Sequence, residues 1–254
     1  MTRLDNKVAI VTGASSGIGR AAALLFARQG AKLVLSARGR ERLDAVAEEI
    51  RSEGGMSIAV PGDVSEEAHH QALIATAQKE FGGLDIAFNN AGTTGPVGAL
   101  PDLSMEEWQE VLGINLTSGF LAAKYQLPAM EARGGGSIVF TSTFVGYTAG
   151  FPGLAAYAAS KSGLVGLVQV LASEYGPKGI RVNALLPGAT DTPMGRDVAN
   201  TPEARQFVAG LNAFKRIAEP EEIAEAALFL CSDASSFTTG TAMLVDGGVS
   251  INRA

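Results

Sequence analysis

The sequence predicts a doubly wound α/β fold with a seven-stranded parallel sheet, in a single domain of 254 residues. Three observations support this class. Short apolar runs recur along the chain, helical stretches with a 3.6-residue apolar period separate them, and many of the 31 glycines lie at turns between the two. Because the runs are apolar on both faces, they are typical of parallel strands covered by helices on two sides. The expected strands are Val8–Val11, Lys32–Leu35, Ser57–Val60, Leu84–Phe88, Ser137–Thr141, Arg181–Leu186 and Met243–Val245.

The expected helices are marked by apolar stripes and by their starting residues. Stripes at i, i+3, i+4 and i+7 begin at Ile18, Leu164 and Ile223, and each gives a face that can pack on the sheet. Pro220 suits the first turn of the last of these helices.

Capping residues predict two further helix starts. Ser104-Met-Glu-Glu107 forms a capping box that opens one long helix towards Arg133. Ser65, with two glutamates after it, suits another helix N-terminus. The segment 190–212 is the least regular, and it follows a strand end, where ligands bind in such sheets. We therefore expect a mobile substrate lid there. No linker or repeat divides the chain, so residues 1–254 are expected to form one domain.

The overall composition excludes several classes of protein. The net charge of −6 and the pI of about 5.1 make a nucleic acid or an anionic membrane surface a poor partner. No apolar run approaches the ~20 residues of a membrane span, and residues 1–7 lack the apolar core of a signal peptide. Cys231, the one cysteine, cannot form an internal disulfide. His69 and His70 are adjacent and face apart on a helix, so no metal site is expected. We expect a soluble, cytoplasmic protein whose partner is a small molecule.

A glycine-rich turn follows the first expected strand. It reads Thr12-Gly13-Ala14-Ser15-Ser16-Gly17-Ile18-Gly19 and leads into a helix. Glycines at such a junction let backbone N–H groups approach a phosphate without an intervening Cβ. The spacing is neither the G-x-G-x-x-G dinucleotide pattern nor a P-loop. Its place after the first strand favours a nucleotide phosphate site over a purely structural turn.

This turn and several later motifs resemble, in the same order, those of the short-chain dehydrogenase/reductase family. The turn resembles the family's TGxxxGIG stretch, and Tyr157-Ala-Ala-Ser-Lys161 resembles its YxxxK pair. The resemblance spans about Lys7 to Gly248 and implies a Rossmann-type fold that transfers hydride between a nicotinamide cofactor and a carbonyl or alcohol. The other matching elements are Asp63-Val64, Asn89-Asn90-Ala91-Gly92, Asn115, the hydroxyls of Ser142 and Thr143, Pro187-Gly188, Thr239-Gly240 and Asp246-Gly247-Gly248.

The end of the second expected strand bears on the choice of cofactor. Proteins that prefer NAD carry an acid there for the ribose 2′-OH, and a basic residue accommodates the 2′-phosphate of NADP. The resemblance puts this position at Ala37, which has no carboxylate. Arg38 follows, and its planar guanidinium suits phosphate oxygens; Arg40 and Ser36 are secondary candidates. We expect NADP(H) to be preferred over NAD(H). The alternative is that these arginines are a solvated helix start.

The resemblance also implies where each motif meets the cofactor. Asp63 and Val64 would lie at the adenine ring, residues 90–92 along the ribose and phosphates, and residues 187–192 beside the nicotinamide. The expected cofactor-binding residues are Gly13, Ser15, Ser16, Gly17, Ile18, Gly19, Arg38, Asp63, Val64, Asn90, Ala91, Gly92, Tyr157, Lys161, Pro187, Gly188, Thr190 and Thr192.

Tyr157 and Lys161 are the expected centre of the chemistry. They lie four residues apart in a helical stretch and therefore share one face. A tyrosine pKa is near 10, and a nearby ammonium lowers it, which suits Tyr157 as the general acid or base at a carbonyl or alcohol oxygen. The resemblance implies that Lys161 also bonds the nicotinamide ribose, and that Asn115 bends its helix and holds a water near the lysine.

A further catalytic hydroxyl is expected at the end of the fifth strand. Counting along the strand from Gly136 favours Thr143, since Ser142 would point to the opposite face. Ser142 stays open as the alternative, because the loop to Tyr157 is one residue longer than in common family members.

The pocket and the substrate are less defined than the chemistry. If the resemblance holds, Phe144, Tyr147, Phe151 and Met194 border the pocket and favour a carbonyl substrate with an apolar part. A 3-oxoacyl-thioester reductase and an NAD-dependent sugar or steroid alcohol dehydrogenase remain alternatives, as does a non-enzymatic NADP(H)-binding regulator. Because the family is usually tetrameric, we expect a homotetramer.

Overall fold

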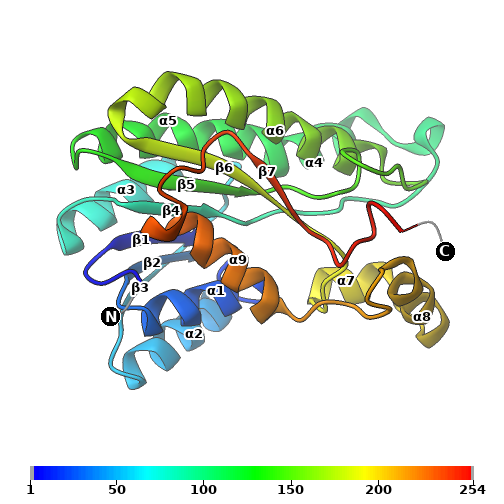
Figure 1. The fold of residues 1–254 in the computed structure, drawn as a ribbon, viewed down its shortest axis with the longest axis horizontal. Coiled ribbons are helices and arrows are strands. Elements are labelled where there is room, and N and C mark those ends of the chain that lie inside the picture. The colour runs from blue at the N-terminus through cyan, green and yellow to red at the C-terminus, as the bar shows by residue number, and fades with distance from the viewer. Residues whose placement is uncertain (1–2, 253–254) are drawn as a thin grey trace.

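The computed structural model describes residues 3–252, which contain one sheet of seven parallel strands (Figure 1). The strand order is β3-β2-β1-β4-β5-β6-β7, with every neighbouring pair parallel. This confirms the fold class expected from the sequence. The strands are β1 (Val8–Thr12), β2 (Lys32–Ala37), β3 (Met56–Pro61), β4 (Ile86–Asn89), β5 (Gly136–Thr141), β6 (Ile180–Pro187) and β7 (Ala242–Val245).

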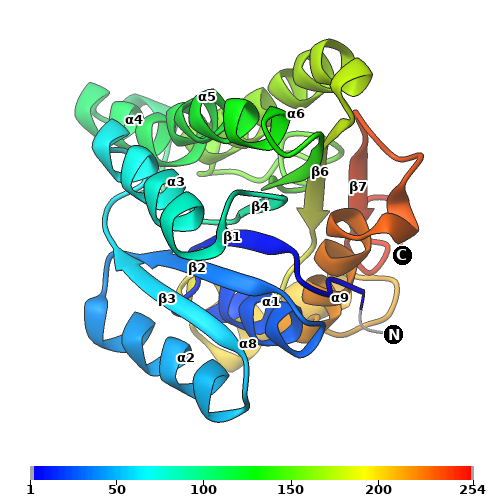
Figure 2. The same ribbon diagram turned by 90° about the vertical axis from the view of Figure 1, so that its left-hand side faces the viewer.

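Helices cover both faces of the sheet (Figure 2). Buried side chains of α1, α2 and α9 form a cluster on one face, and those of α3, α5 and α6 form a second cluster on the other. The short helices α7 and α8 follow the carboxyl end of β6. The helices are α1 (Gly17–Arg28), α2 (Arg40–Ser52), α3 (Glu67–Phe81), α4 (Met105–Leu112), α5 (Ser118–Glu131), α6 (Ala155–Tyr175), α7 (Pro193–Val198), α8 (Pro202–Leu211) and α9 (Pro220–Cys231).

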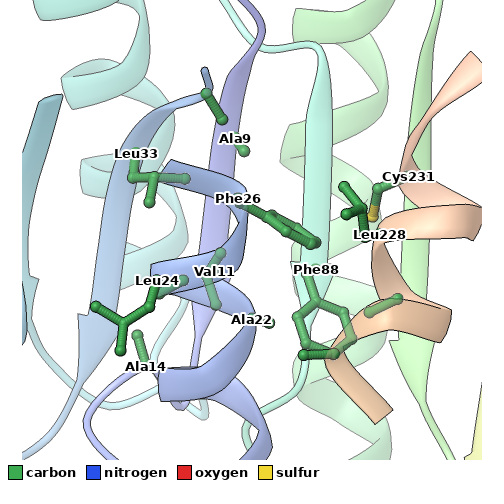
Figure 3. Packing of buried hydrophobic residues seen from close by; sticks show 14 of the residues in the cluster. Ala9, Val11, Ala14, Ala22, Leu24, Phe26, Leu33, Phe88, Leu228 and Cys231 are labelled. Carbon is green, nitrogen blue, oxygen red and sulfur yellow. The ribbon is translucent and has the colours of Figure 1, made fainter. Parts of the chain in front are cut away.

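The central strand β1 contributes to both clusters. Val11 points into the cluster under α1 and α9, and Ile10 into the cluster under α3 and α6. Phe26 of α1 and Phe88 of β4 lie with ring centroids 6.2 Å apart, which joins the helix to the middle of the sheet (Figure 3). Burying one such side chain contributes ~1.5–3 kcal/mol. The strand ends that carry the predicted motifs are therefore supported by a well-packed hydrophobic core.

The long helix expected from Ser104 to Arg133 is interrupted. Its capping box is present: the Ser104 hydroxyl accepts from the Glu107 N–H at 3.2 Å, and the Glu107 carboxylate accepts from the Ser104 N–H at 2.8 Å. Between α4 and α5, however, residues Gly113–Thr117 form a π-helical turn. Such a turn inserts one extra residue into a helix and is frequent at functional sites.

The segment 190–212 is more regular than the sequence analysis expected, because it contains α7 and α8. Both helices start with a threonine cap, and proline fills the first helical position of each. The hydroxyls of Thr192 and Thr201 accept from the N–H group three residues further on, at 3.0 and 3.1 Å.

Helix α6 is long and apolar enough to cross a membrane, judged by length and composition alone. No stretch of this kind was expected from the sequence. In the fold, α6 is a core helix: Leu164 and Val168 are buried in the cluster between it and the sheet. Packing against the sheet accounts for its apolar composition.

Candidate active site

A cavity of about 340 Å³ opens at the carboxyl ends of the strands. It lies where the strand order reverses between β1 and β4, the place at which ligands bind in doubly wound sheets. Predicted site residues that line it are Gly13, Ser16, Gly17, Ile18, Asn90, Ala91, Gly92, Ser142, Thr143, Tyr157, Lys161, Pro187, Gly188, Thr190 and Thr192. Those outside its lining are Ser15, Gly19, Arg38, Asp63, Val64 and Asn115.

The glycine turn leaves no room for side chains. Gly13 and Gly17 have φ values of 68° and 51°, in the left-handed region. A Cβ on Gly19 would lie 2.2 Å from the Gly13 carbonyl oxygen. Ser16, the N-cap of α1, makes no side-chain cap hydrogen bond, and first-turn N–H groups have no partner within their own helix. The turn is thus a tight cradle that fits a phosphate group.

Thr12 ties the glycine turn to the end of β4. Its hydroxyl accepts from the N–H groups of Asn90 and Ala91, at 3.0 and 3.1 Å. The Asn90 side chain donates to the Thr12 carbonyl at 3.3 Å and accepts from the Thr141 hydroxyl at 3.2 Å. These hydrogen bonds therefore join the carboxyl ends of β1, β4 and β5. Neither Thr12 nor Thr141 was among the predicted site residues, although Thr12 begins the glycine motif.

Arg38 and Asp63 follow the carboxyl ends of β2 and β3. Arg38 is exposed, and its guanidinium makes no hydrogen bond or ion pair with any of residues 3–252. Burial raises the pKa of Asp63, but hydrogen bonds from the Ser65 N–H and hydroxyl, with the Arg38 charge, outweigh it and leave this pKa below its ordinary value. Because Ser65 is bound to Asp63, it does not cap α3, which begins at Glu67 without a side-chain cap.

Tyr157 and Lys161 lie together on α6 and both line the cavity. The Tyr157 hydroxyl hydrogen-bonds the Thr143 hydroxyl. Lys161 is buried, and its Nζ donates to the Thr141 carbonyl oxygen at 2.7 Å. The structure therefore brings the predicted phenol, ammonium and hydroxyl to one wall of one cavity.

Burial governs how both groups titrate. It raises the pKa of the Tyr157 phenol above its ordinary value, while the Thr143 hydrogen bond acts in the opposite direction. It lowers the pKa of Lys161 to about 8, so the ammonium is still mostly charged at neutral pH. For Tyr157 this is opposite to the expected lowering. The reason is that desolvation of the buried phenolate outweighs the Thr143 hydrogen bond.

Ser142 and Thr143 both line the cavity, but their hydroxyls have different partners. Ser142 Oγ donates to the Lys161 carbonyl oxygen at 2.8 Å. Thr143 Oγ1 accepts from the Val145 N–H at 3.2 Å and also hydrogen-bonds Tyr157. The Ser142 hydroxyl is thus engaged with the main chain of α6, and the Thr143 hydroxyl lies beside the phenol.

Asn115 is buried in the π-helical turn. Its side chain accepts from the Thr93 N–H at 2.8 Å, and its amide donates to the Thr93 carbonyl at 2.8 Å and to Ser160 Oγ at 3.0 Å. A Cβ on Gly92 would lie 3.0 Å from both Asn115 Oδ1 and Lys161 Nζ. A second cavity of about 10 Å³, the size of one water, is lined in part by Asn115 and Lys161. Sequence reasoning missed Thr93 and Ser160, although Ser160 lies within the YxxxK stretch.

The residues that follow β6, in the segment 190–212, contact the glycine turn. The Thr192 hydroxyl caps α7, and its methyl group lies within 2.9 Å of where a Cβ on Gly17 would be. Thr190 Oγ1 donates to the Gly188 carbonyl at 3.0 Å. The hydroxyls of both predicted cofactor-binding threonines thus have partners in their own segment.

Most of the remaining cavity wall is apolar, although Thr94 and the ion-paired Asp191 and Arg205 also line the cavity. Phe144 and Phe151 meet edge to face at 5.5 Å and line the cavity with Met194, as expected. Tyr147 was wrongly placed: it is 48% exposed and lies in a turn that follows Gly146, outside the lining. The apolar lining residues that could not be named from the sequence are Val145, Leu154, Ala189, Pro193, Val198, Ala199, Val208 and Ile217.

Comparisons with known proteins give matches over nearly the whole chain. A family model described as enoyl-(acyl carrier protein) reductase matches residues 13–250. Cyclohexanol dehydrogenase from Acinetobacter sp. strain SE19 is 40% identical over 245 residues, which are 96% of this chain and 95% of that protein. The chain belongs to the short-chain dehydrogenase/reductase family. This confirms the resemblance found in the sequence.

Solved structures of family members agree closely with the fold. Levodione reductase has a TM-score of 0.94 at 36% identity, covering 98% of this chain and 99% of that chain. A 7α-hydroxysteroid dehydrogenase complexed with NADH and 7-oxo glycochenodeoxycholic acid has a TM-score of 0.93 at 36% identity, covering 97% and 95%. This short-chain dehydrogenase/reductase is therefore an enzyme that uses NAD(P)(H) to interconvert alcohol and ketone groups of small molecules.

Proposed function

We propose that this enzyme transfers hydride between NADP(H) and an apolar cyclic ketone or secondary alcohol, with Tyr157 as general acid and base. The observation that carries the proposal is the pairing of the Tyr157 and Thr143 side chains, one helical turn from the buried Lys161, in the wall of a largely apolar cavity.

Each of these side chains has a defined task. In reduction, the Tyr157 O–H donates its proton to the substrate oxygen, and in oxidation the phenolate takes it back. The Thr143 hydroxyl donates a hydrogen bond to the same oxygen and holds it near the phenol. The bound cofactor supplies hydride and, when oxidised, a positive charge that favours the phenolate. Lys161 adds a second positive charge. It borders the water-sized cavity beside Asn115, which offers a proton path away from the phenol.

The preference for NADP(H) is supported by the end of β2. Ala37 provides no carboxylate for a ribose 2′-OH, and the Arg38 guanidinium is exposed and not hydrogen-bonded to residues 3–252. Replacing Arg38 by alanine should remove a charge-assisted hydrogen bond of ~1.5–3 kcal/mol and raise the NADPH Kd roughly ten- to a hundredfold. Arg51→Ala, in the last turn of α2 and paired with Glu48, is the control. Fluorescence titration measures both cofactors, and NADH binding as tight as NADPH would refute the preference.

The cyclic substrate is supported by the cavity wall and by the relatives. Phe144, Phe151 and Met194 offer aromatic and thioether surfaces to a compact apolar ring. Cyclohexanol dehydrogenase is similar to this chain in sequence, and levodione reductase is similar to it in fold. A lid formed by residues 190–212 would exclude water from this space. We also propose that the enzyme is a homotetramer and that it is cytoplasmic.

The decisive experiment follows NADPH oxidation with cyclohexanone and with an acetoacetyl thioester. Tyr157→Phe should abolish turnover while the enzyme still binds NADPH, whereas Tyr175→Phe, at the far end of the same helix, should leave turnover intact. Faster reduction of the thioester would favour the 3-oxoacyl reductase alternative. Tight NADPH binding with no turnover of any carbonyl tested would favour the regulator.

A further inference from the structure

Two adjacent histidines near the start of α3 are buried, and neither lines the main cavity, although His70 borders the water-sized cavity beside Asn115 and Lys161. His69 is 8% exposed and His70 is 3% exposed, and their ring centroids lie 6.4 Å apart. Among the described residues 3–252, no group of three or more His, Cys, Asp or Glu side chains could hold a metal ion. Each ring instead reaches a different strand end.

His69 joins the carboxyl ends of β2 and β3. Its Nε2 lies 2.7 Å from Ser36 Oγ, and a Cβ on Gly62 would lie 2.2 Å from its Nδ1, so the ring packs directly on the Gly62 backbone. Ser36 is fully buried, which removes it as a candidate for the 2′-phosphate. The Ser36 carbonyl accepts from the Ala14 N–H in the glycine turn at 3.0 Å. One imidazole thus packs against both segments that carry the adenosine motifs.

His70 holds the next residues of the loop. Its Nε2 donates to the Val64 carbonyl oxygen at 2.7 Å. Asp63 lies between Gly62, which contacts His69, and Val64, which binds His70. The loop after β3 is therefore fixed on both sides of the Asp63 carboxylate.

We propose that His69 and His70 are positioning residues that hold the adenosine end of the cofactor site, by fixing the β2 end before Arg38 and the Asp63–Val64 loop. The inference rests on the proposed function, because it takes that end of the site to bind the cofactor's adenosine. The two loops would otherwise lose conformational freedom when the nucleotide binds. Fixing them in the folded protein removes that cost from binding.

A positioning role and simple core packing predict different effects on ligand affinity. Loss of a buried hydrogen bond alone lowers the stability of the fold. Loss of preorganisation at one end of the site weakens ligands that carry adenosine and leaves the nicotinamide end unchanged. Fragments of the cofactor separate the two effects.

The experiment measures Kd by calorimetry for 2′,5′-ADP, 5′-AMP and reduced nicotinamide mononucleotide, with full-length His69→Ala and His70→Ala. Each variant should raise the Kd of the adenosine fragments about tenfold and leave the mononucleotide Kd unchanged. His69→Ala, which does not border the water-sized cavity, should also raise KM for NADPH at unchanged kcat. His69→Gln and His70→Gln, which restore a hydrogen-bonding group near Nε2, should recover most of the affinity.

Ser57→Ala is the matched control. It removes a buried hydrogen bond of 2.8 Å from Ser57 to the Ala47 carbonyl at the opposite end of β3, so adenosine affinity should not change. If the alanine variants do not fold, Ser36→Ala removes the same His69 contact with less change in volume, and the same rise in Kd is expected.

Three results would overturn the inference. Unchanged adenosine affinity in folded variants shows that the histidines are only core residues. Equal weakening of the mononucleotide shows a general loosening of the site. A wild-type enzyme that binds neither NADPH nor NADH refutes the proposed function itself, whereas the first two results leave it standing.

Discussion

Replacing Thr143 by valine tests the arrangement at the phenol most directly. Valine keeps the branched shape of threonine and removes only the hydroxyl. The change deletes the hydrogen bond to Tyr157 and the acceptor for the Val145 N–H at 3.2 Å. Because burial raises the pKa of Tyr157 and the Thr143 bond opposes this, valine should raise that pKa further.

The expected magnitude separates chemistry from stability. Removing one hydrogen-bond donor from a reacting oxygen costs about 10²–10³ in kcat, or ~2.7–4 kcal/mol. Losing one neutral hydrogen bond lowers the free energy of unfolding by only ~0.5–1.5 kcal/mol. Ser142→Ala is the matched control, because it removes a bond of 2.8 Å to the Lys161 carbonyl and leaves the Tyr157–Thr143 pair intact. It should therefore share the small loss of stability without the large loss of turnover.

The assay is steady-state reduction of cyclohexanone with NADPH across pH, together with thermal unfolding of each variant. Thr143→Val should show a deep loss of kcat and a basic limb of its pH profile moved to higher pH. Abolished turnover in Ser142→Ala, with Thr143→Val still active, would show that the hydroxyl has been assigned to the wrong residue.

Three further predictions concern the rest of the fold. Gly19→Ala should destabilise the protein and abolish NADPH binding, because its Cβ would lie 2.2 Å from the Gly13 carbonyl oxygen; retained affinity in calorimetry would contradict the tight turn. Burial lowers the pKa of His69 and of His70 below 6.5, so the unfolded chain binds more protons just below that pH. Their contribution to the free energy of unfolding is complete above about pH 6.5 and lost as pH falls below it. Urea titrations at a series of pH values should show this loss. After both histidines are changed to glutamine, the free energy of unfolding should depend less steeply on pH. Cys231 should react with Ellman's reagent only on unfolding, since burial raises its thiol pKa to about 12; fast labelling of the native enzyme would disprove this.

The strands were predictable because apolar runs mark them locally, but their limits depend on partners. The run Leu84–Phe88 was expected as a strand, whereas β4 is Ile86–Asn89. Its ladder with β1 begins at the pair Ala9–Ile86, so a distant strand sets where β4 starts. The π-helical turn between α4 and α5 likewise depends on tertiary contacts of Asn115, which a helical stripe does not reveal. By contrast, the starts of α7 and α8 could have been found from their Thr-Pro pairs.

The candidate site, too, was predictable where local geometry decides and not where tertiary contacts decide. The four-residue spacing of Tyr157 and Lys161 was enough to place them together, because a helix fixes that geometry locally. The sign of the Tyr157 pKa shift was not predictable, since it depends on how deeply the fold buries the phenol. The partners of His69 and His70 were missed for a related reason. Adjacent helical residues face apart, as expected, but nothing local shows that each face meets a separate strand end.

The hydrogen bond from Asn90 to the Thr12 hydroxyl has a consequence for folding kinetics. It joins residues 78 positions apart, at the carboxyl ends of the neighbouring strands β1 and β4. Closing so large a loop costs entropy before any contact is gained, and proteins dominated by such distant pairings fold slowly. A newly made chain must therefore bring β4 against β1 before it can enclose a pyrophosphate, and dinucleotide added during refolding should report a late step.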